Sequence, residues 1–213
     1  MFVVCHDGHM AVSAELRRRQ PVQERSRKRV ERILASALNL LNAGGADAVT
    51  TRAIASAAGI PVATVYQFFP NREAILVELL EAFLARRDVE GLALLAELTP
   101  ATLDEVFGEI CRFHRDGLAE YPHMADLYYT YRANGMVPDA RDLRAAFAKY
   151  LHSRLTEWGL IDAAVPRTAL QFAVELGDHI IELAHHSGPD AARILDEGVR
   201  AITSYLRSYD APD

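Results

Sequence analysis

The chain has 213 residues, of which 50% are hydrophobic, and a formal net charge of −6 at pH 7. This size and composition suit one or two small domains with a packed core. No apolar run reaches the ~18 residues that a membrane-spanning helix needs, so we expect a soluble, cytoplasmic protein. The distant Cys5 and Cys111 fit a reducing compartment and suggest neither a disulfide nor a metal framework.

The start of the chain, "MFVVCHDGHM", is too short and too interrupted by polar residues to be a secretion signal. The first nine residues fit an upstream start codon or an expression remnant, with Met10 as a candidate native start. We expect residues 1–23 to form a disordered extension.

Charge divides the chain into a basic front and an acidic body. Residues 1–72 carry ten Lys/Arg and five Asp/Glu, a net +5, whereas residues 73–213 carry thirteen and twenty-four, a net −11. This division favours a polyanion as the partner of the front alone. A solvated basic helix is the alternative, and charge alone leaves both open.

Apolar residues recur at helical spacing along the whole chain, and strand-type alternation is nowhere sustained. The first predicted helix, residues 24–43, has one apolar and one basic face and ends at the glycine pair 44–45. The apolar stripe comprises Val30, Ile33, Leu34, Ala37, Leu38 and Leu41, and the basic face Arg25, Arg27, Lys28, Arg29 and Arg32.

Two short helices and a long one come next. Thr50 or Thr51 is a good N-cap for a helix that ends at Gly59, and a second short helix covers residues 61–69. Asn71 is the expected N-cap of a long helix that reaches about residue 98. Further helices are predicted at roughly 102–119, 122–132, 139–157, 166–186 and 189–207, with prolines near their first turns. The expected fold is all-α with about nine helices.

The two short helices and the glycine between them form a helix-turn-helix pattern, whose second helix enters the major groove of DNA. We expect Ile54, Ala57, Ile60, Val65 and Phe69 to point inward, and Val62, Ala63, Thr64, Tyr66 and Gln67 to lie on or near the outer face. We therefore expect a DNA-binding domain at 24–72 and a second domain at 73–213, for which the resemblance and the apolar stripes given below predict ligand binding and dimerisation.

Residues 32–83 contain, in order, an apolar first helix, then "T-x-x-x-I-A-x-x-A-G", then "T-V-Y-x-F-F-x-x-R-E". In this order and spacing they resemble the DNA-binding domain of the TetR family of bacterial repressors. The resemblance implies an N-terminal three-helix DNA-binding domain on a helical ligand-binding bundle, a homodimer, and an inverted-repeat operator. The remainder of the chain resembles the family only in helix count and length.

The resemblance also implies which residues meet DNA. Phosphate contacts fall on Thr51, Arg52, Thr64, Tyr66 and Arg72, and base edges face Val62, Ala63 and Gln67. Gln67 can pair with adenine in a bidentate manner. Tyr66 as a core residue and Gln67 as a merely solvated side chain are the alternatives.

This sequence departs from the family pattern at two neighbouring positions. Pro61 stands where a Ser or Thr often caps the recognition helix, and Val62 stands where a Lys is common. The basic run at 25–32, which includes Arg29, could compensate together with Arg17, Arg18 and Arg19. We hypothesise that it lies along phosphates or sends a disordered arm into a minor groove.

Apolar stripes on the last two helices predict a dimer interface. Residues 166–186 carry two stripes, so one would face the subunit's own core and the other a partner. The expected interface residues are Leu170, Val174, Gly177, Ile181, Leu195, Val199, Ile202 and Leu206. Gly177 costs ~1 kcal/mol in a helix, which makes sense if another helix approaches closely. A helix buried within a monomer is the alternative.

The region 103–136 is rich in aromatic, His and Met residues and suggests a pocket for a small apolar or aromatic effector. The candidate lining residues are Phe107, Ile110, Phe113, His114, Met124, Tyr128, Tyr131, Trp158, Phe172 and His179. An ordinary core is the alternative for each of them.

The favoured function is a cytoplasmic, nucleoid-associated transcriptional repressor that an effector releases from its operator. The competing classes are an all-helical enzyme, with His114, His179, Asp178 or Glu175 as catalytic candidates, and a helical bundle that binds proteins. No histidine pair has the spacing of a helical zinc site, so no metal and no cofactor are expected.

Overall fold

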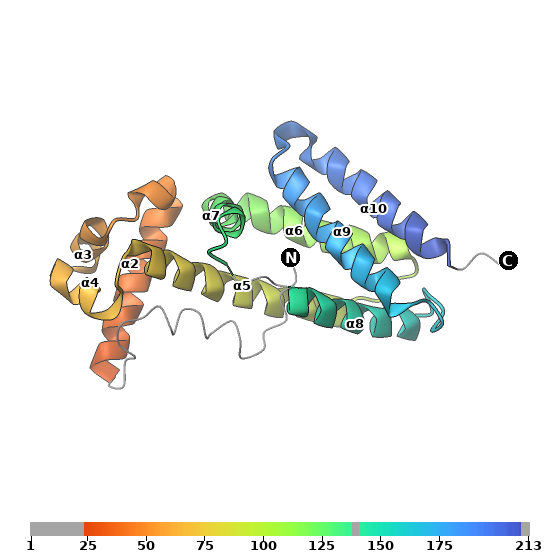
Figure 1. Cartoon of the computed structure of the whole chain (residues 1–213), viewed down its shortest axis with the longest axis horizontal. Helices are drawn as coiled ribbons and strands as arrows, with labels where there is room; N and C mark the ends of the chain where they lie inside the picture. The colour runs from red at the N-terminus through yellow and green to blue at the C-terminus, as the bar shows by residue number, and fades with distance from the viewer. Residues whose placement is uncertain (1–23, 138–140, 210–213) are drawn as a thin grey trace. The chain divides into compact units, whose positions relative to one another are not determined.

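The computed structural model describes residues 24–137 and 141–209, and these ranges form nine α-helices, one short 3-10 turn and no strand. The helices are α2 (Glu24–Ala48), α3 (Thr51–Ala58), α4 (Val62–Phe68), α5 (Arg72–Glu97), α6 (Leu103–Glu120), α7 (Pro122–Ala133), α8 (Arg141–Glu157), α9 (Arg167–His185) and α10 (Ala191–Arg207) (Figure 1). The predicted all-α class is confirmed. The expected extension and arm over residues 1–23 lie outside the described residues.

The N-terminal compact unit contains α2, α3, α4, the first part of α5 up to residue 86, and α7. Helix α2 breaks at the predicted glycine pair, where Gly44 and Gly45 leave helical geometry. Gly45 has φ 69°, a left-handed conformation that favours glycine. The chain can therefore turn here before α3 begins.

Helix α3 is held at both ends. The side chain of Thr50 accepts a hydrogen bond of 3.1 Å from the backbone N–H of Ala53, as expected for an N-cap. At the other end, Gly59 adopts φ 61° and Arg32 of α2 donates to the carbonyl oxygen of Ala58. Arg32, expected only on the basic face, thus also stabilises the C-terminus of α3, where the helix dipole favours a cation.

Helix α7 packs on α2 within the same unit, although it follows α6 in the sequence. The ring of His123 lies 3.4 Å from the place that a Cβ on Gly45 would take. The rings of Tyr121 and Phe83 meet edge to face at 5.3 Å, beneath the guanidinium of Arg86. The N-terminal unit therefore extends beyond residues 24–72, and a separate functional domain at 24–72 stays a prediction.

The C-terminal compact unit contains the end of α5 from residue 87 together with α6, α8, α9 and α10. Helix α9 is central in this unit, since it contacts α6, α8 and α10. Arg87 joins α5 to α6, because its guanidinium stacks on the ring of Phe113 at 3.6 Å and donates to that residue's carbonyl at 2.7 Å. Thr203 of α10 donates to Asp104 of α6 at 3.2 Å.

Candidate functional site

The helix-turn-helix pair α3–α4 has the inner and outer faces that the sequence predicts, with one exception. Ile54, Val65 and Phe69 are fully buried, while Arg52, Ala63 and Gln67 are exposed. Tyr66 is 41% exposed, which argues against a core role. Ala57, expected inward, is exposed. The neighbouring Ala55 and Ala58 are buried in its place, because they lie on the side of α3 that carries Ile54.

A direct contact links the start of α3 to α4. The hydroxyls of Thr51 and Tyr66 lie 3.3 Å apart in a hydrogen bond at the surface. Thr64 and Val62 are half-buried at the beginning of α4. The two linked hydroxyls form a small group of donors beside the exposed Arg52, and such groups suit phosphate oxygens.

The N-terminus of α4 lacks a side-chain cap. Pro61 occupies the N-cap position with extended geometry, φ −61° and ψ 144°, and contributes no side-chain hydrogen bond. The loss of a cap that the sequence predicts is thereby confirmed. The next helix is capped as expected, because Oδ1 of Asn71 accepts from the N–H of Ala74 at 2.9 Å.

Further cations flank this surface. Arg72, at the start of α5, lies 3.3 Å from the carboxylate of Glu73 and keeps 32% of its side chain exposed. Arg29 is exposed on α2, as are Arg25, Arg27 and Lys28. These positions place positive charge on the unit that carries the helix-turn-helix, and they suit an electrostatic contact with a phosphate backbone.

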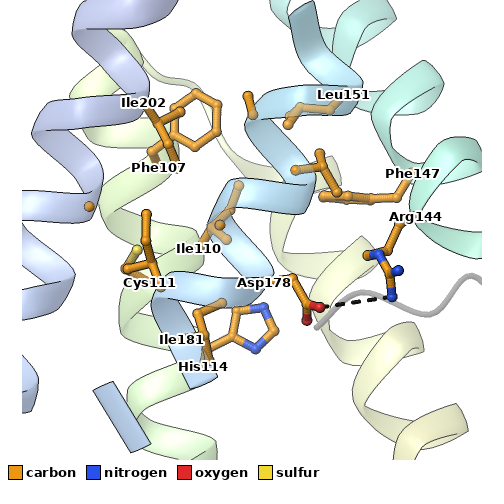
Figure 2. Close-up of a pocket in the computed structure, with 15 residues that line it drawn as sticks. Phe107, Ile110, Cys111, His114, Arg144, Phe147, Leu151, Asp178, Ile181 and Ile202 are labelled. Atoms are coloured by element: carbon orange, nitrogen blue, oxygen red, sulfur yellow. Dashed lines mark ion pairs between the residues drawn. The ribbon is translucent and has the colours of Figure 1, made fainter. Parts of the chain in front are cut away.

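A cavity of about 50 Å³ lies within the C-terminal unit (Figure 2). Helices α6, α8, α9 and α10 all contribute to its lining. The lining residues are Phe107, Ile110, Cys111, His114, Arg144, Phe147, Leu151, Ala173, Val174, Gly177, Asp178, Ile180, Ile181, Gly198 and Ile202. Most of these side chains are apolar, so the cavity favours hydrocarbon over water.

Polar groups gather at one end of the cavity, around Asp178 (Figure 2). Arg144 Nε lies 2.8 Å from Glu175 Oε2, and Arg144 Nη1 lies 3.8 Å from Asp178 Oδ2. Burial, assisted by the charge of Arg87, holds the pKa of His114 well below its usual 6.5, so the imidazole is neutral at pH 7. Burial likewise raises the pKa of the Cys111 thiol to about 11.

The structure brings only part of the predicted ligand-binding set to this cavity. Phe107, Ile110 and His114 line it. The other seven lie elsewhere. Met124, Tyr128 and Tyr131 are buried on α7 of the N-terminal unit. Phe113 packs under the guanidinium of Arg87, and Trp158 packs under that of Arg154 at 4.5 Å, whereas Phe172 is 55% exposed and His179 forms a hydrogen bond with the carbonyl of Glu175 at the surface. The first three belong to a different compact unit, and the last four side chains do not line the cavity.

Sequence reasoning did not select the cavity's three α8 residues or Cys111 of α6. Arg144, Phe147 and Leu151 follow one another at helical spacing on α8, and Cys111 lies one turn from His114 on α6. Their spacing could have indicated a buried face of α8. Nothing in the sequence distinguishes a face that lines a cavity from one that fills a core.

The buried His114 makes stability depend on pH. Its pKa is lowered on folding, so below about pH 6.5 the unfolded chain binds a proton that the folded chain does not. Acidification should therefore destabilise the protein. When the pH falls from about 7.5 to about 5.5, the free energy of unfolding of the wild type should decrease by ~1 kcal/mol more than that of His114→Phe. Denaturant titrations of both proteins at each pH would measure this difference. Parallel pH profiles for the two proteins would contradict this assignment.

The α9–α10 surface that is open to a partner differs from the expected one. Leu170, Ile202 and Leu206 lie in the main core of their own unit, and Ile181 and Leu195 form a second small core. Val174 and Gly177 line the cavity, and Val199 packs on the core. These residues face inward because α6 and α8 cover that side of α9. The eight residues expected at the interface are thus already packed within the chain.

Part of the second apolar stripe of α9, which comprises Ala173, Leu176, Ile180 and Leu183, faces outward. Leu183 is 57% exposed and Leu176 and Ile180 are half-buried, whereas Ala173 is buried in the core. Phe172, which lies outside this stripe, is 55% exposed. With α10, Leu176, Ile180 and Leu183 form a groove of about 620 Å³, which we call the α9–α10 groove; it is lined by Leu176, Ile180, Leu183, Asp190, Arg193, Ile194, Glu197, Gly198 and Ala201. Large apolar side chains on a surface indicate a place where another molecule binds.

Within 24–137 and 141–209, no three His, Cys, Asp or Glu side chains lie close enough together to hold a metal ion. Among the helices described above, none combines the length and apolar character that crossing a bilayer requires.

Residues 33–79 match the model of a domain family described as bacterial regulatory proteins, tetR family. A repressor, HTH-type transcriptional repressor KstR of Rhodococcus jostii (strain RHA1), is 38% identical over 65 residues, which cover 30% of this chain and 31% of that protein. The KstR of Mycobacterium tuberculosis (strain ATCC 25618 / H37Rv) is 36% identical over 67 residues, or 32% of this chain and 30% of that protein. The match therefore spans about a third of these relatives.

Solved structures resemble the chain over most of its length. A TetR-family transcriptional regulator from Streptomyces coelicolor aligns with a TM-score of 0.56 at 23% identity, covering 85% of this chain and 99% of that one. A TetR variant from Acinetobacter baumannii AYE, solved with minocycline, aligns with a TM-score of 0.57 at 19% identity, covering 84% and 97%. At these identities the likeness establishes the fold.

Proposed function

We propose that the chain is a ligand-responsive, dimeric transcriptional repressor of the TetR family, because its residues 33–79 match the model of the tetR family of bacterial regulatory proteins. The observation that carries this proposal is the exposed outer face of α4, where Ala63, Tyr66 and Gln67 project from a buried helix-turn-helix core. In this proposal the protein acts at the cytoplasmic nucleoid, binds an inverted-repeat operator, and dissociates from it when an effector binds.

The roles at the DNA follow from side-chain chemistry. Thr51, Tyr66 and Arg52 contact phosphates, and Thr64, Arg29 and Arg72 add to that contact. Gln67 reads a base edge, and Val62 and Ala63 permit close approach to thymine methyl groups. The hydrogen bond of 3.3 Å between Thr51 and Tyr66 supports this assignment, because it holds both hydroxyls at the same place.

A dimer positions two such heads on one operator. We assign its interface to the α9–α10 groove and to the exposed Phe172 and Leu183, rather than to the stripe expected from the sequence. A two-fold axis would pair the same surface of both copies. The two recognition helices would then be separated by one turn of B-DNA, ~34–36 Å, or by a multiple of it.

The cavity of the C-terminal unit is the proposed effector site. Its volume of about 50 Å³ is far below the ~300–1,000 Å³ of pockets that hold drug-sized ligands. An effector must therefore widen it, and so binds more tightly to a conformation in which the surrounding helices have separated. Helix α5 contributes residues to both units and is the proposed connection to the DNA-binding head.

A gel-shift titration tests the proposal. The full chain would be mixed with DNA from upstream of its own gene, across a salt series and against scrambled competitor. We expect one competitor-resistant complex on an inverted repeat, with affinity that falls as salt rises. An absent or sequence-independent shift would overturn the repressor function and favour an enzyme or a protein-binding bundle.

Two substitutions on the DNA-binding face should act differently. Gln67→Ala should relax base preference at one position in each half-site, with a loss of ~1–3 kcal/mol on the preferred sequence only. Thr51→Ala serves as the matched variant and should weaken binding to all sequences alike. Gel shifts on an operator library would measure both effects. Uniform weakening by Gln67→Ala, with relaxed specificity in Thr51→Ala, would reverse the assignment.

A further inference from the structure

The charges around the cavity restrict the class of effector. We propose that the effector is an uncharged, mostly hydrocarbon molecule with a single hydroxyl or carbonyl oxygen, and that this oxygen lies at the His114 end of the cavity. The inference rests on the function proposed above and specifies the ligand of the same site.

The walls of the cavity require a hydrocarbon body. Apolar side chains from α6, α8, α9 and α10 enclose it, among them Phe107, Ile110, Phe147, Leu151, Ile181 and Ile202 (Figure 2). A ligand in contact with these walls loses its water along most of its length. Groups that depend on hydration are thereby disfavoured everywhere except at the polar end.

The two charged side chains that line the cavity are of opposite sign. Arg144 and Asp178 are 12% and 6% exposed and lie 3.8 Å apart, so they form one buried pair. Glu175, the second carboxylate on Arg144, does not line the cavity and is 30% exposed. A charged head group could gain a counter-charge at this end only by competing with one member of the buried pair for the other, whereas an uncharged oxygen leaves the pair intact.

The other polar side chains at this end are uncharged at pH 7. Burial keeps the pKa of His114 low and the pKa of Cys111 high, at about 11, so the first is a neutral imidazole and the second a thiol. A neutral imidazole carries one N–H donor and one nitrogen acceptor. Both are suited to a hydroxyl group, and the donor is suited to a carbonyl oxygen.

A matched series of ligands tests the proposal. Octanol, octylamine and octanoate share one hydrocarbon body, and at neutral pH they are uncharged, cationic and anionic. Calorimetric titration of the full chain without DNA should give a Kd for octanol about tenfold below that of either charged analogue. Tighter binding of octylamine or octanoate, or no binding of octanol, would overturn the proposal.

Substitutions at Cys111 test whether octanol occupies this cavity. Cys111→Met should fill much of the free volume and weaken octanol binding about tenfold, whereas Cys111→Ala should enlarge the cavity and tighten binding. If Cys111→Met does not fold, as judged by circular dichroism, Cys111→Ala alone carries the test. An unchanged Kd in every folded variant would place octanol elsewhere and overturn the proposal.

The outcome is independent of the proposed repressor function. Ligand binding is measured without DNA, and operator binding is measured without ligand. Octanol selectivity together with an absent operator complex would support the ligand class and reject the repressor. A specific operator complex together with selectivity for octanoate would support the repressor and reject the uncharged effector.

Discussion

Leu183→Glu is expected to convert the protein to a monomer and to weaken operator binding by about 10²–10⁴-fold, because the two heads then bind separately. Leu183 is 57% exposed in the described chain, so the substitution should leave the folded monomer intact. In the proposed dimer the same side chain is buried against the apolar residues of the groove, and a carboxylate there would lose its hydration. Light scattering after gel filtration would give the mass, and a gel shift the affinity.

Ala146→Glu provides a matched control. Ala146 is exposed on α8, away from the α9–α10 groove, and the change adds the same carboxylate to the surface of a helix. This variant should remain dimeric and should bind the operator nearly as well as the wild type. A Leu183→Glu protein that stays dimeric would move the interface away from the α9–α10 groove.

Helix positions were predictable because the prolines and glycines at helix ends agree with the periodicity of the apolar residues. Pro122 begins α7, Pro166 precedes α9, and Gly59 ends α3 in the left-handed conformation that glycine favours. Ala63, Tyr66 and Gln67, three of the five residues predicted on the outer face of α4, are exposed, and Val62 and Thr64 are half-buried. Short helices that cover a small core leave few choices for which side chains point inward, so most of this part of the site could be predicted.

The C-terminal unit was less predictable, because the sequence does not show which element covers which stripe. Both stripes of α9 have helical spacing, and only the positions of α6 and α8 decide that Leu170 faces inward and Leu183 outward. The aromatic composition of region 103–136 suggested a single pocket, whereas the two helices of this region belong to different compact units. Periodicity identifies a buried face but not its neighbour.

Close helix packing gives a further example. The sequence singled out Gly177 as a point of close approach, but a Cβ there would lie 3.6 Å from Ile202, an ordinary contact. The tight position is Gly198 on α10, where a Cβ would lie 2.5 Å from Cγ2 of Ile180. Gly198 is the residue at which α9 and α10 depend on the absence of a side chain.

Gly198→Ala should therefore destabilise the protein by ~1–3 kcal/mol, although alanine is the better helix former. The methyl group of Ile180 that it would strike is fixed on a branched Cβ, so the rotamer must change or the helices must separate. Because Gly198 lines both the cavity and the α9–α10 groove, the shift should also weaken dimerisation. Denaturant unfolding at several protein concentrations would measure both effects.

Gly108→Ala on α6 separates the packing effect from helix propensity. Nothing lies within 4 Å of a Cβ at Gly108, so the same substitution should stabilise the protein by ~0.5–1 kcal/mol. The two alanine variants should thus shift the free energy of unfolding in opposite directions. If both stabilise the protein, α9 and α10 can separate at little cost, and the close contact between Gly198 and Ile180 does not hold the dimer surface in shape.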